Sequence, residues 1–355
     1  MRYCMAWIVT FVSLGVPSLA GAAFTPFVVE NSGGSQVWPA VSGSFVFWSE
    51  IANGGFFVRG KNIATGQVFS IDGPGWEFGP STNGSIVVWG DNRAGNGDVY
   101  AMDLQTGYQW ALVDGPYNQS GVVGENYVVW GDDRYTPPKA PPEDRVIVLY
   151  AMDLRTGQQF EVGRGGGADV SGDVIVWSNA RSAYLPSGEE VYGYNVETGK
   201  QFLIASDPTY RPQELPAVSG NTVVWVDLHN GGDIMGYNIS TAMAFPIHVD
   251  PEDSPADQLY PDIDGRYVVW LDGRNVDGVF AWTIMGYDLV SAQEFRIADA
   301  GFQVEPKISG NLVVWNTPFD PGAPSRIMAA YIPEPASAGL LGLGAALLAG
   351  RRGGR

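Results

Sequence analysis

Seven short apolar runs, each ending in tryptophan, dominate the pattern of hydrophobic and polar positions along the chain. In each run, two or three residues that favour β-strands precede the tryptophan. The tryptophans are Trp48, Trp89, Trp130, Trp177, Trp225, Trp270 and Trp315, at spacings of 41 to 48 residues. Repeats of this length are typical of the four-stranded blades of a β-propeller, so the pattern predicts an all-β fold with seven blades.

Other features repeat in phase with the tryptophans. Glycine lies five residues before six of them, and proline lies nine residues before five of them. A second block follows, as in Tyr100–Gly107, and an aromatic residue comes three positions later. Turn residues separate these segments, so each unit is predicted to form four antiparallel strands. In the third unit Gly124 lies one place further back, which predicts a one-residue adjustment there. Because the strands are apolar on both faces, we expect the tryptophans in the core between blades rather than at a ligand site.

The two ends of the repeat region complement each other. The seventh unit reaches Ile332 without a fourth strand, whereas Phe24–Glu30, before the first unit, resembles the fourth strand Phe295–Asp299. We therefore expect the N-terminal strand to complete the last blade, which removes an exposed sheet edge. The predicted propeller spans residues 24–332.

The full repeat reads Pro-x-Val-Ser-Gly-Asn-x-Val-Val-Trp, followed by Tyr-x-x-Asp-Leu-x-Thr-Gly. It resembles the TolB-like (WD40-like) propeller repeats of exported bacterial proteins over nearly all of residues 24–332. The family's usual Ser-Pro-Asp-Gly is Val-Ser-Gly-Asn here, so the resemblance implies a shared architecture only. Such repeats serve as interaction surfaces, as side domains of proteases and, in a few cases, as lyases, so the fold leaves the function open.

Both ends of the chain carry predicted sorting segments. Residues 1–22 resemble a secretory signal peptide, with Arg2, an apolar stretch and small residues at the predicted cleavage point. Residues 333–355 resemble a PEP-CTERM sorting tail, which has a Pro-Glu-Pro motif, an apolar helix and an arginine cluster. The residues that carry this resemblance are Pro333, Glu334, Pro335, Arg351 and Arg352.

The resemblance of the tail implies transient membrane insertion and processing by an exosortase. Its apolar stretch is shorter than the about 20 residues of a stable transmembrane helix, and an ordinary tail anchor is the alternative. We therefore expect an exported protein at the cell surface or outside the cell, with a membrane-associated precursor.

Charge and cysteine content narrow the possible partners. The net charge is −18, which repels nucleic-acid phosphates, so no nucleic-acid partner is expected. The single cysteine, Cys4, lies in the predicted signal peptide, so the propeller has no disulfide and depends on packing.

Two sets of loop residues are candidates for binding, on the face where loops vary in length. Exposed aromatic rings beside carboxylates suit sugars, although these rings could instead pack against neighbouring loops. The aromatic candidates are Trp76, Tyr117, Tyr135, Tyr184, Tyr210, Tyr260 and Trp282. Acidic loops offer the oxygen ligands that calcium prefers, and Ca²⁺ is the one cofactor considered. The metal candidates are Asp91, Asp98, Asp227, Asp233, Asp272 and Asp277.

The recurrence of these aspartates favours a structural role over a metal site. Asp recurs two residues after the tryptophan, and Arg recurs four residues after it. Such a pair is typical of turn capping or of an ion pair within one blade.

Catalytic motifs are scarce. The chain has two histidines, His229 and His248, and lacks a serine-nucleophile elbow or zinc-ligand spacing. We therefore expect a non-enzymatic module that binds polysaccharide or a surface protein. The alternative is a polysaccharide lyase or glycosidase that uses acidic residues near the propeller channel, and a third possibility is a purely structural propeller.

Overall fold

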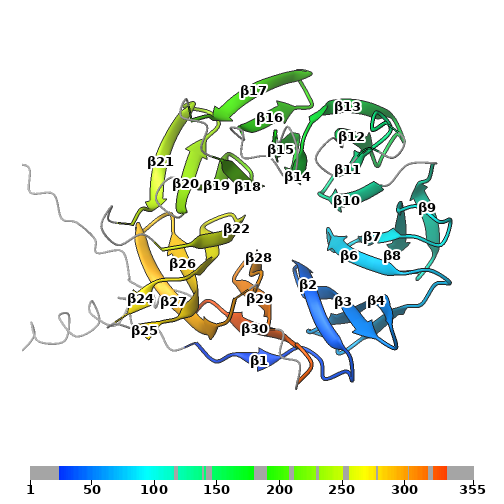
Figure 1. The fold of residues 1–355 in the computed structure, drawn as a ribbon, viewed down its shortest axis with the longest axis horizontal. Coiled ribbons are helices and arrows are strands. Elements are labelled where there is room, and N and C mark those ends of the chain that lie inside the picture. The colour runs from blue at the N-terminus through cyan, green and yellow to red at the C-terminus, as the bar shows by residue number, and fades with distance from the viewer. Residues whose placement is uncertain are drawn as a thin grey trace, which may run out of the picture.

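A computed structural model describes residues 24–115, 119–137, 140, 146–179, 190–207, 212–228, 232–250, 256–276, 279–302, 304–318 and 323–333. Within them, seven sheets of four antiparallel strands form a ring, which confirms the predicted all-β propeller (Figure 1). These residues include no helix, and so none long and apolar enough to cross a membrane. The signal peptide and all of the sorting tail after Pro333 lie outside the described residues.

Blades 1 to 6 run outward from the channel in sequence order, and blade 7 takes its outermost strand from the N-terminus. The strands of blades 1 to 3 are β2 (Ser35–Ser42), β3 (Phe45–Ala52), β4 (Gly55–Asn62), β5 (Val68–Ile71), β6 (Glu77–Thr82), β7 (Ile86–Asp91), β8 (Asp98–Asp103), β9 (Gln109–Val113), β10 (Gln119–Val123), β11 (Tyr127–Asp132), β12 (Val148–Asp153) and β13 (Gln159–Arg164). Blades 4 and 5 contain β14 (Gly166–Ser171), β15 (Val174–Ser178), β16 (Val191–Asn195), β17 (Lys200–Ala205), β18 (Gln213–Ser219), β19 (Thr222–Asp227), β20 (Asp233–Asn238) and β21 (Met243–His248).

Blade 6 also carries a small two-stranded ribbon in one loop. Its strands are β22 (Gln258–Asp264), β23 (Tyr267–Asp272), β26 (Trp282–Asp288) and β27 (Gln293–Ala300), with the ribbon formed by β24 (Asn275–Val276) and β25 (Val279–Phe280). Blade 7 contains β28 (Lys307–Ser309), β29 (Leu312–Asn316), β30 (Ile327–Tyr331) and β1 (Phe27–Val28).

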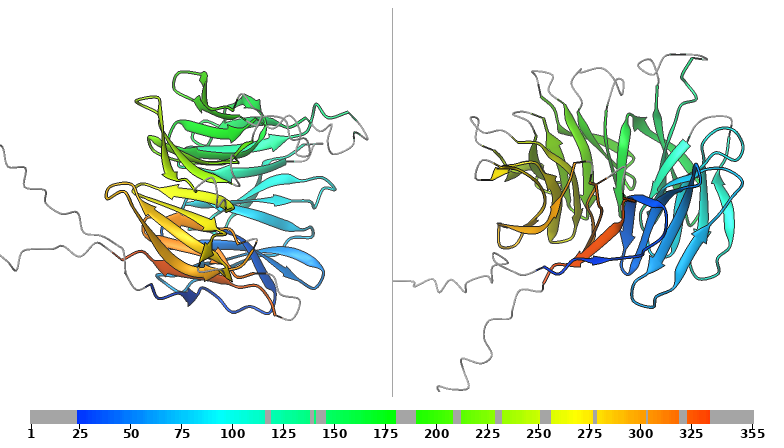
Figure 2. Two further views of the ribbon diagram at one scale, coloured as in Figure 1. Left: turned by 60° about the vertical axis from the view of Figure 1, so that its left-hand side comes forward. Right: turned by 60° about the horizontal axis from the view of Figure 1, so that its bottom comes forward.

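The ring closes as the sequence predicts. Strand β1 pairs antiparallel with β30, so the N-terminal segment supplies the fourth strand of the last blade. Figure 2 shows the two strands side by side at the edge of the ring. Blade 7 therefore joins the two ends of the described chain.

The seven tryptophans form the core between blades, as expected. Each is at most 3% exposed. Trp89 of blade 2, for example, packs in one cluster with Phe47, Phe69 and Ile71 of blade 1. Burying an aromatic side chain of this size removes a large apolar area from water, so these contacts dominate the packing of one blade on the next.

The innermost strands carry a repeated β-bulge near the loop face. In five blades two residues lie opposite the tryptophan, and the first of the two has a positive φ. These bulge residues are Trp38, Gly79, Gly167, Leu215 and Tyr260. Strand β10 of blade 3 pairs with β11 without a register shift and therefore has no bulge. Its pairs Val122–Val129 and Val123–Val128 keep the register of the other blades, so the shifted Gly124 changes the hairpin alone. The extra residue of each bulge changes the alternation of side chains along the strand, and so determines which of them point into the channel mouth.

Candidate functional site

The innermost strands of all seven blades enclose a central channel with a cavity of about 510 Å³. The residue eight positions before each tryptophan faces this channel from an equivalent place in its blade. In blade order these seven residues are Ala40, Ser81, Val122, Asp169, Ala217, Asp262 and Lys307. The channel is therefore uncharged at this level in blades 1 to 3 and charged in blades 4, 6 and 7.

Asp262 and Lys307 form the centre of the charged half. The Lys307 Nζ lies 3.8 Å from Asp262 Oδ1, and the two side chains are 41% and 16% exposed. Asp262 Oδ2 accepts a hydrogen bond of 2.7 Å from the backbone N–H of Ile308 in the next blade. The lysine is thus deep in the channel, beside a carboxylate, yet open to solvent.

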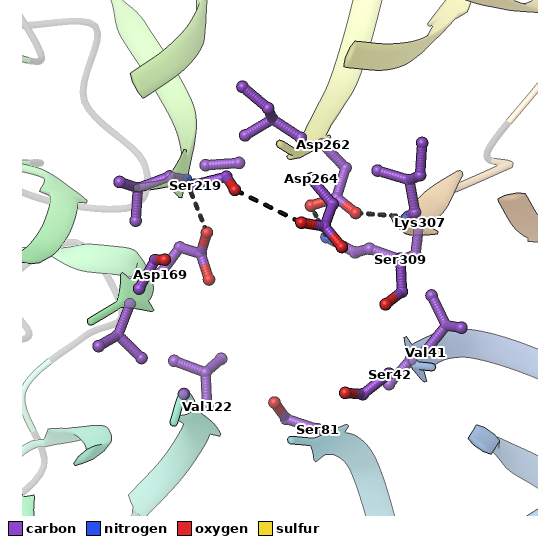
Figure 3. Close-up of a pocket in the computed structure, with 18 of the residues that line it drawn as sticks. Val41, Ser42, Ser81, Val122, Asp169, Ser219, Asp262, Asp264, Lys307 and Ser309 are labelled. Atoms are coloured by element: carbon purple, nitrogen blue, oxygen red, sulfur yellow. Dashed lines mark hydrogen bonds and ion pairs between the residues drawn. The ribbon is translucent and has the colours of Figure 1, made fainter. Parts of the chain in front are cut away.

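Asp169 lies across the channel and makes the same kind of inter-blade bond. Its Oδ2 accepts a 2.8 Å hydrogen bond from Val218 N–H, and Figure 3 shows its carboxylate pointing into the open centre. In blade 2, Ser81 Oγ accepts the equivalent bond from Val123 N–H at 3.0 Å. Since a neutral hydroxyl is enough to join two blades, the negative charge at Asp169 and Asp262 has no structural necessity.

The protein environment shifts the pKa values of these groups. Burial raises the pKa of Asp262 to about 6, with a further increase from Asp169 and a partial decrease from Lys307. Burial also raises the pKa of Asp169 and of Glu305 at the channel mouth. The attraction of Asp262 raises the pKa of Lys307, so this side chain stays a cation. Near pH 6 Asp262 can therefore both accept and donate a proton, next to a fixed positive charge.

A second ring, nearer the hairpin face, holds adjacent blades together. Ser309 Oγ accepts a hydrogen bond from Gly43 N–H across the blade 7–blade 1 junction, and Asp264 Oδ2 accepts one from Gly310 N–H. Figure 3 shows Asp264 and Ser309 with Ser42 around the same opening. Most of the acceptors at this level are serine hydroxyls, which carry no charge. We therefore assign these bonds to the stability of the propeller.

The aromatic candidates are dispersed among the blades. Trp76 is 49% exposed and packs against Phe56, and Tyr135 is 56% exposed. Trp282 is half-buried against Phe302, with ring centroids 5.3 Å apart. Tyr260, a bulge residue, is the described candidate that lines the channel. Tyr117, Tyr184 and Tyr210 lie outside the described residues.

Most of the acidic candidates are held by neighbours in their own blade. Asp91 is buried and paired with Arg93, and Asp272 is buried and paired with Arg274. Hydrogen bonds reach Asp98 from Asn96, Asp227 from Gln213 and Asp233 from the backbone of Asp250. Asp277 lies outside the described part of the chain. The ion pairs match the structural role that the recurrence of Asp and Arg indicates, and calcium binding stays a prediction.

His248 links blades 5 and 6. Its Nδ1 lies 2.5 Å from Glu294 Oε1, and its Nε2 lies 3.0 Å from Asp250 Oδ1. Burial opposes the charge on the ring, but the hydrogen bonds to Glu294 and Asp250 outweigh it and raise the pKa of His248. The two carboxylates therefore favour the protonated form of this buried ring. His229 lies outside the described residues.

Comparisons with known proteins extend this description. No protein-family model matches the sequence, and no curated protein gives a significant match. Solved structures do match. An oligogalacturonate lyase in complex with manganese is 12% identical, with a TM-score of 0.59 over 88% of this chain and 96% of the other. An oligogalacturonate lyase from Vibrio parahaemolyticus is 14% identical, with a TM-score of 0.59 over 88% and 97%. An acylaminoacyl peptidase from Pyrococcus horikoshii is 11% identical, with a TM-score of 0.61 over 86% of this chain and 52% of the peptidase.

These similarities show the propeller fold, and they correct one expectation from the sequence. We expected a non-enzymatic binding module, but the propellers that this chain resembles belong to enzymes. That expectation rested on the absence of familiar catalytic motifs, but a propeller draws its channel residues from separate blades. No contiguous motif is needed in such a site.

Sequence reasoning missed Asp169, Asp262 and Lys307. A signal for them exists, because all three lie eight residues before a tryptophan. When the seven units are aligned on the tryptophans, this column has small or apolar residues in four units and charged residues in three. A charge at a position where the repeat does not require one is the feature that points to the site.

Proposed function

We propose that this protein is an exported polysaccharide lyase that cleaves a uronate-containing chain in the central channel. The observation that carries the proposal is the group formed by Asp169, Asp262 and Lys307, in which Asp262 lies beside the lysine and Asp169 faces the same opening from across the channel. Burial raises the pKa of both carboxyls. The similarity to two oligogalacturonate lyases over nearly their full lengths supports the choice of substrate class.

Each of the three residues has a role in β-elimination. Lys307 pairs with the substrate carboxylate, which makes the proton on the adjacent carbon more acidic. Asp262, next to Lys307, takes that proton. The electrons of the broken C–H bond form a carbon–carbon double bond, and the bond to the glycosidic oxygen breaks. Asp169, whose burial raises its pKa and so favours the protonated form, gives its proton to the leaving oxygen, and no water is consumed. Activity is expected to rise with pH through about 6, as Asp262 loses its proton and becomes the base.

The described residues do not fit a resident metal of the kind found with one of the lyases. They contain no group of three or more His, Cys, Asp or Glu side chains arranged to hold an ion. In the channel, the cation beside Asp262 is the lysine of the chain itself. We therefore assign the neutralisation of the substrate carboxylate to Lys307.

A glycosidase is the second candidate, and the pair of carboxyls with raised pKa values favours it. Asp169 and Asp262 would then serve as the acid and the base that activates water. Hydrolysis of a neutral sugar leaves Lys307 without a role, so the lyase accounts for more of the site.

Location and processing complete the proposal. We also propose that the signal peptide directs export and that an exosortase processes the PEP-CTERM tail. The protein would then act at the cell surface. Tyr260 lines the channel, and we propose that it contacts a sugar ring of the substrate.

Product analysis of the full chain tests the reaction class. The protein is incubated at pH 6 with polygalacturonate, alginate and a neutral glucan, and products are followed by ultraviolet absorbance and mass spectrometry. A lyase gives unsaturated products whose masses sum to that of the substrate, whereas a glycosidase adds water. The variant Asp169→Asn keeps an acceptor for Val218 N–H and is expected to fold but lose activity. If none of these polymers is cleaved, the proposal is overturned.

A further inference from the structure

A second cavity opens on the loop face, above blades 2, 3 and 4. Its volume is about 780 Å³, within the range of ligand sites. It shares Val122, Gly167 and Ala168 with the channel lining. The two cavities therefore adjoin at these residues, and we call the second one the blade 2–4 groove.

The bulge residues explain why the groove lies over these blades. Trp38, Leu215 and Tyr260 place side chains at the bulge in blades 1, 5 and 6. Blades 2 and 4 have Gly79 and Gly167 at this position, and β10 of blade 3 has no bulge at all. No bulge side chain narrows the channel mouth on this side, so the opening extends outward.

Glycines and polar groups line the groove. A Cβ atom added at Gly166 or Gly167 would meet nothing within 4 Å, so backbone groups are exposed there. Asn92 and Asn96, from the loop of blade 2, also line it. This mixture of amides and open backbone suits a ligand with many hydroxyl groups.

Trp130, also in the groove lining, has an unused hydrogen-bond donor. Its side chain is 1% exposed, and its indole N–H has no acceptor in the described part of the chain. The equivalent indoles of blades 2, 4, 5 and 6 do donate, as Trp89 does to Asp91 and Trp225 does to Gln213. The indole of Trp48 in blade 1 also has no acceptor among the described residues, but Trp48 lies outside the groove lining. A buried donor without an acceptor destabilises the protein, so a ligand oxygen that accepts from this indole N–H would stabilise the complex.

We propose that the blade 2–4 groove binds the part of the glycan substrate that extends out of the channel, with a sugar oxygen accepting the Trp130 N–H. This inference rests on the proposed function for the identity of the ligand. It adds a subsite that makes the protein prefer chains over single sugars.

The first test fills the groove. Gly166→Phe places a ring in open space without backbone strain, since Gly166 does not have a positive φ. Gly33→Phe is the matched control, because Gly33 is equally open and lies outside the groove lining. Dissociation constants are measured for oligogalacturonates of increasing length. We expect the wild type and Gly33→Phe to bind longer chains more tightly, and Gly166→Phe to bind the longest at least about tenfold more weakly, with the shortest unchanged.

The second test removes the unused donor. Trp130→Phe is expected to weaken binding of the longer chains about fivefold to tenfold, the value of one hydrogen bond. Trp89→Phe, which loses an indole that is already bonded to Asp91, controls for the smaller ring and is expected to leave binding unchanged. Melting temperatures of both variants show that each is folded.

The outcomes separate this inference from the proposed function. Tighter binding of longer chains that Gly166→Phe abolishes, without any cleavage, supports the groove and overturns the lyase. Cleavage by the wild type at rates independent of chain length, or an equal loss in Gly33→Phe, overturns the groove and leaves the lyase standing. If no oligogalacturonate binds, the groove proposal is overturned.

Discussion

The tryptophan layer and the channel layer lie on neighbouring strands of every blade, and they differ in how strictly they repeat. All seven units keep the tryptophan, and each one is buried. The channel position eight residues earlier changes from Ala40 to Asp262 to Lys307. The residues that repeat in every blade stabilise the fold, because each blade packs against its neighbours in the same way. We expect functional residues at positions where only some blades depart from the repeat.

Removal of a tryptophan should give the largest effect on stability. Trp177→Ala deletes a fully buried ring from the cluster between blades 3 and 4 and is expected to cost about 3–5 kcal/mol of unfolding free energy. Chemical denaturation followed by circular dichroism measures this. A loss below about 1 kcal/mol would show that the repeated layer does not carry the packing.

Replacement of the channel lysine should act on activity instead. Lys307→Met removes the cation that pairs with the substrate, and kcat/KM is expected to fall about 10²–10⁴-fold. Because Lys307 lowers the pKa of Asp262, the variant should also move the pH–rate profile to higher pH. Lys307→Arg is expected to retain part of the activity. An unchanged pH profile would contradict the coupling of the two residues.

Glu77 is a second departure from the repeat, at a position where Gln36, Gln213 and Gln258 are found. It is fully buried, one of its oxygens has no partner among the described residues, and burial raises its pKa to about 7. The folded state therefore favours the protonated form, and stability is lost as pH rises from about 4.5 to about 7.

The variant Glu77→Gln is expected to remove this pH dependence. Its amide can accept from Gly73 N–H as Glu77 does, and donate to Asp91 as Gln213 does to Asp227. The gain in unfolding free energy should reach about 3 kcal/mol above pH 7 and vanish near pH 4. Denaturant titrations at both pH values test this, and an equal gain at both would rule out titration of Glu77.

Replacement of His248 should have a smaller effect on stability than replacement of Glu77. Here the titrating group is a base held between two carboxylates. Its raised pKa means that its contribution is complete below pH 6.5 and is lost as pH rises through the folded-state value. Glu294, Asp250 and Arg274 all face this group. His248→Gln is therefore expected to lower the melting temperature at pH 6 more than at pH 9. The same loss at both values would show a packing effect only.

The sequence predicts the fold well because the fold is repeated. Seven copies of one pattern locate the tryptophan strands, and the segment before the first copy identifies the strand that closes blade 7. The bulges were not predictable in the same way, since Trp38, Leu215 and Tyr260 adopt positive φ values that such residues rarely take. Only the glycines at positions 79 and 167 are residues that suit this conformation.

The site was harder to predict because its residues are far apart in the chain. Asp262 and Lys307 are neighbours only because they occupy one position in adjacent blades, and neither belongs to a local motif. The aspartates that do recur, such as Asp91 and Asp272, attract attention in the sequence but are engaged by arginines of their own blades.

The most direct test of the central claim compares two channel residues that make the same inter-blade bond. Asp262→Asn keeps an acceptor for Ile308 N–H, and Ser81→Ala removes the acceptor for Val123 N–H. Turnover of polygalacturonate at pH 6 is measured for both, together with the melting temperature. We predict that Asp262→Asn loses at least about 100-fold in kcat and stays as stable as the wild type, whereas Ser81→Ala keeps its activity and loses a little stability. Equal turnover in wild type and Asp262→Asn would contradict the assignment of the charged half of the channel as the active site.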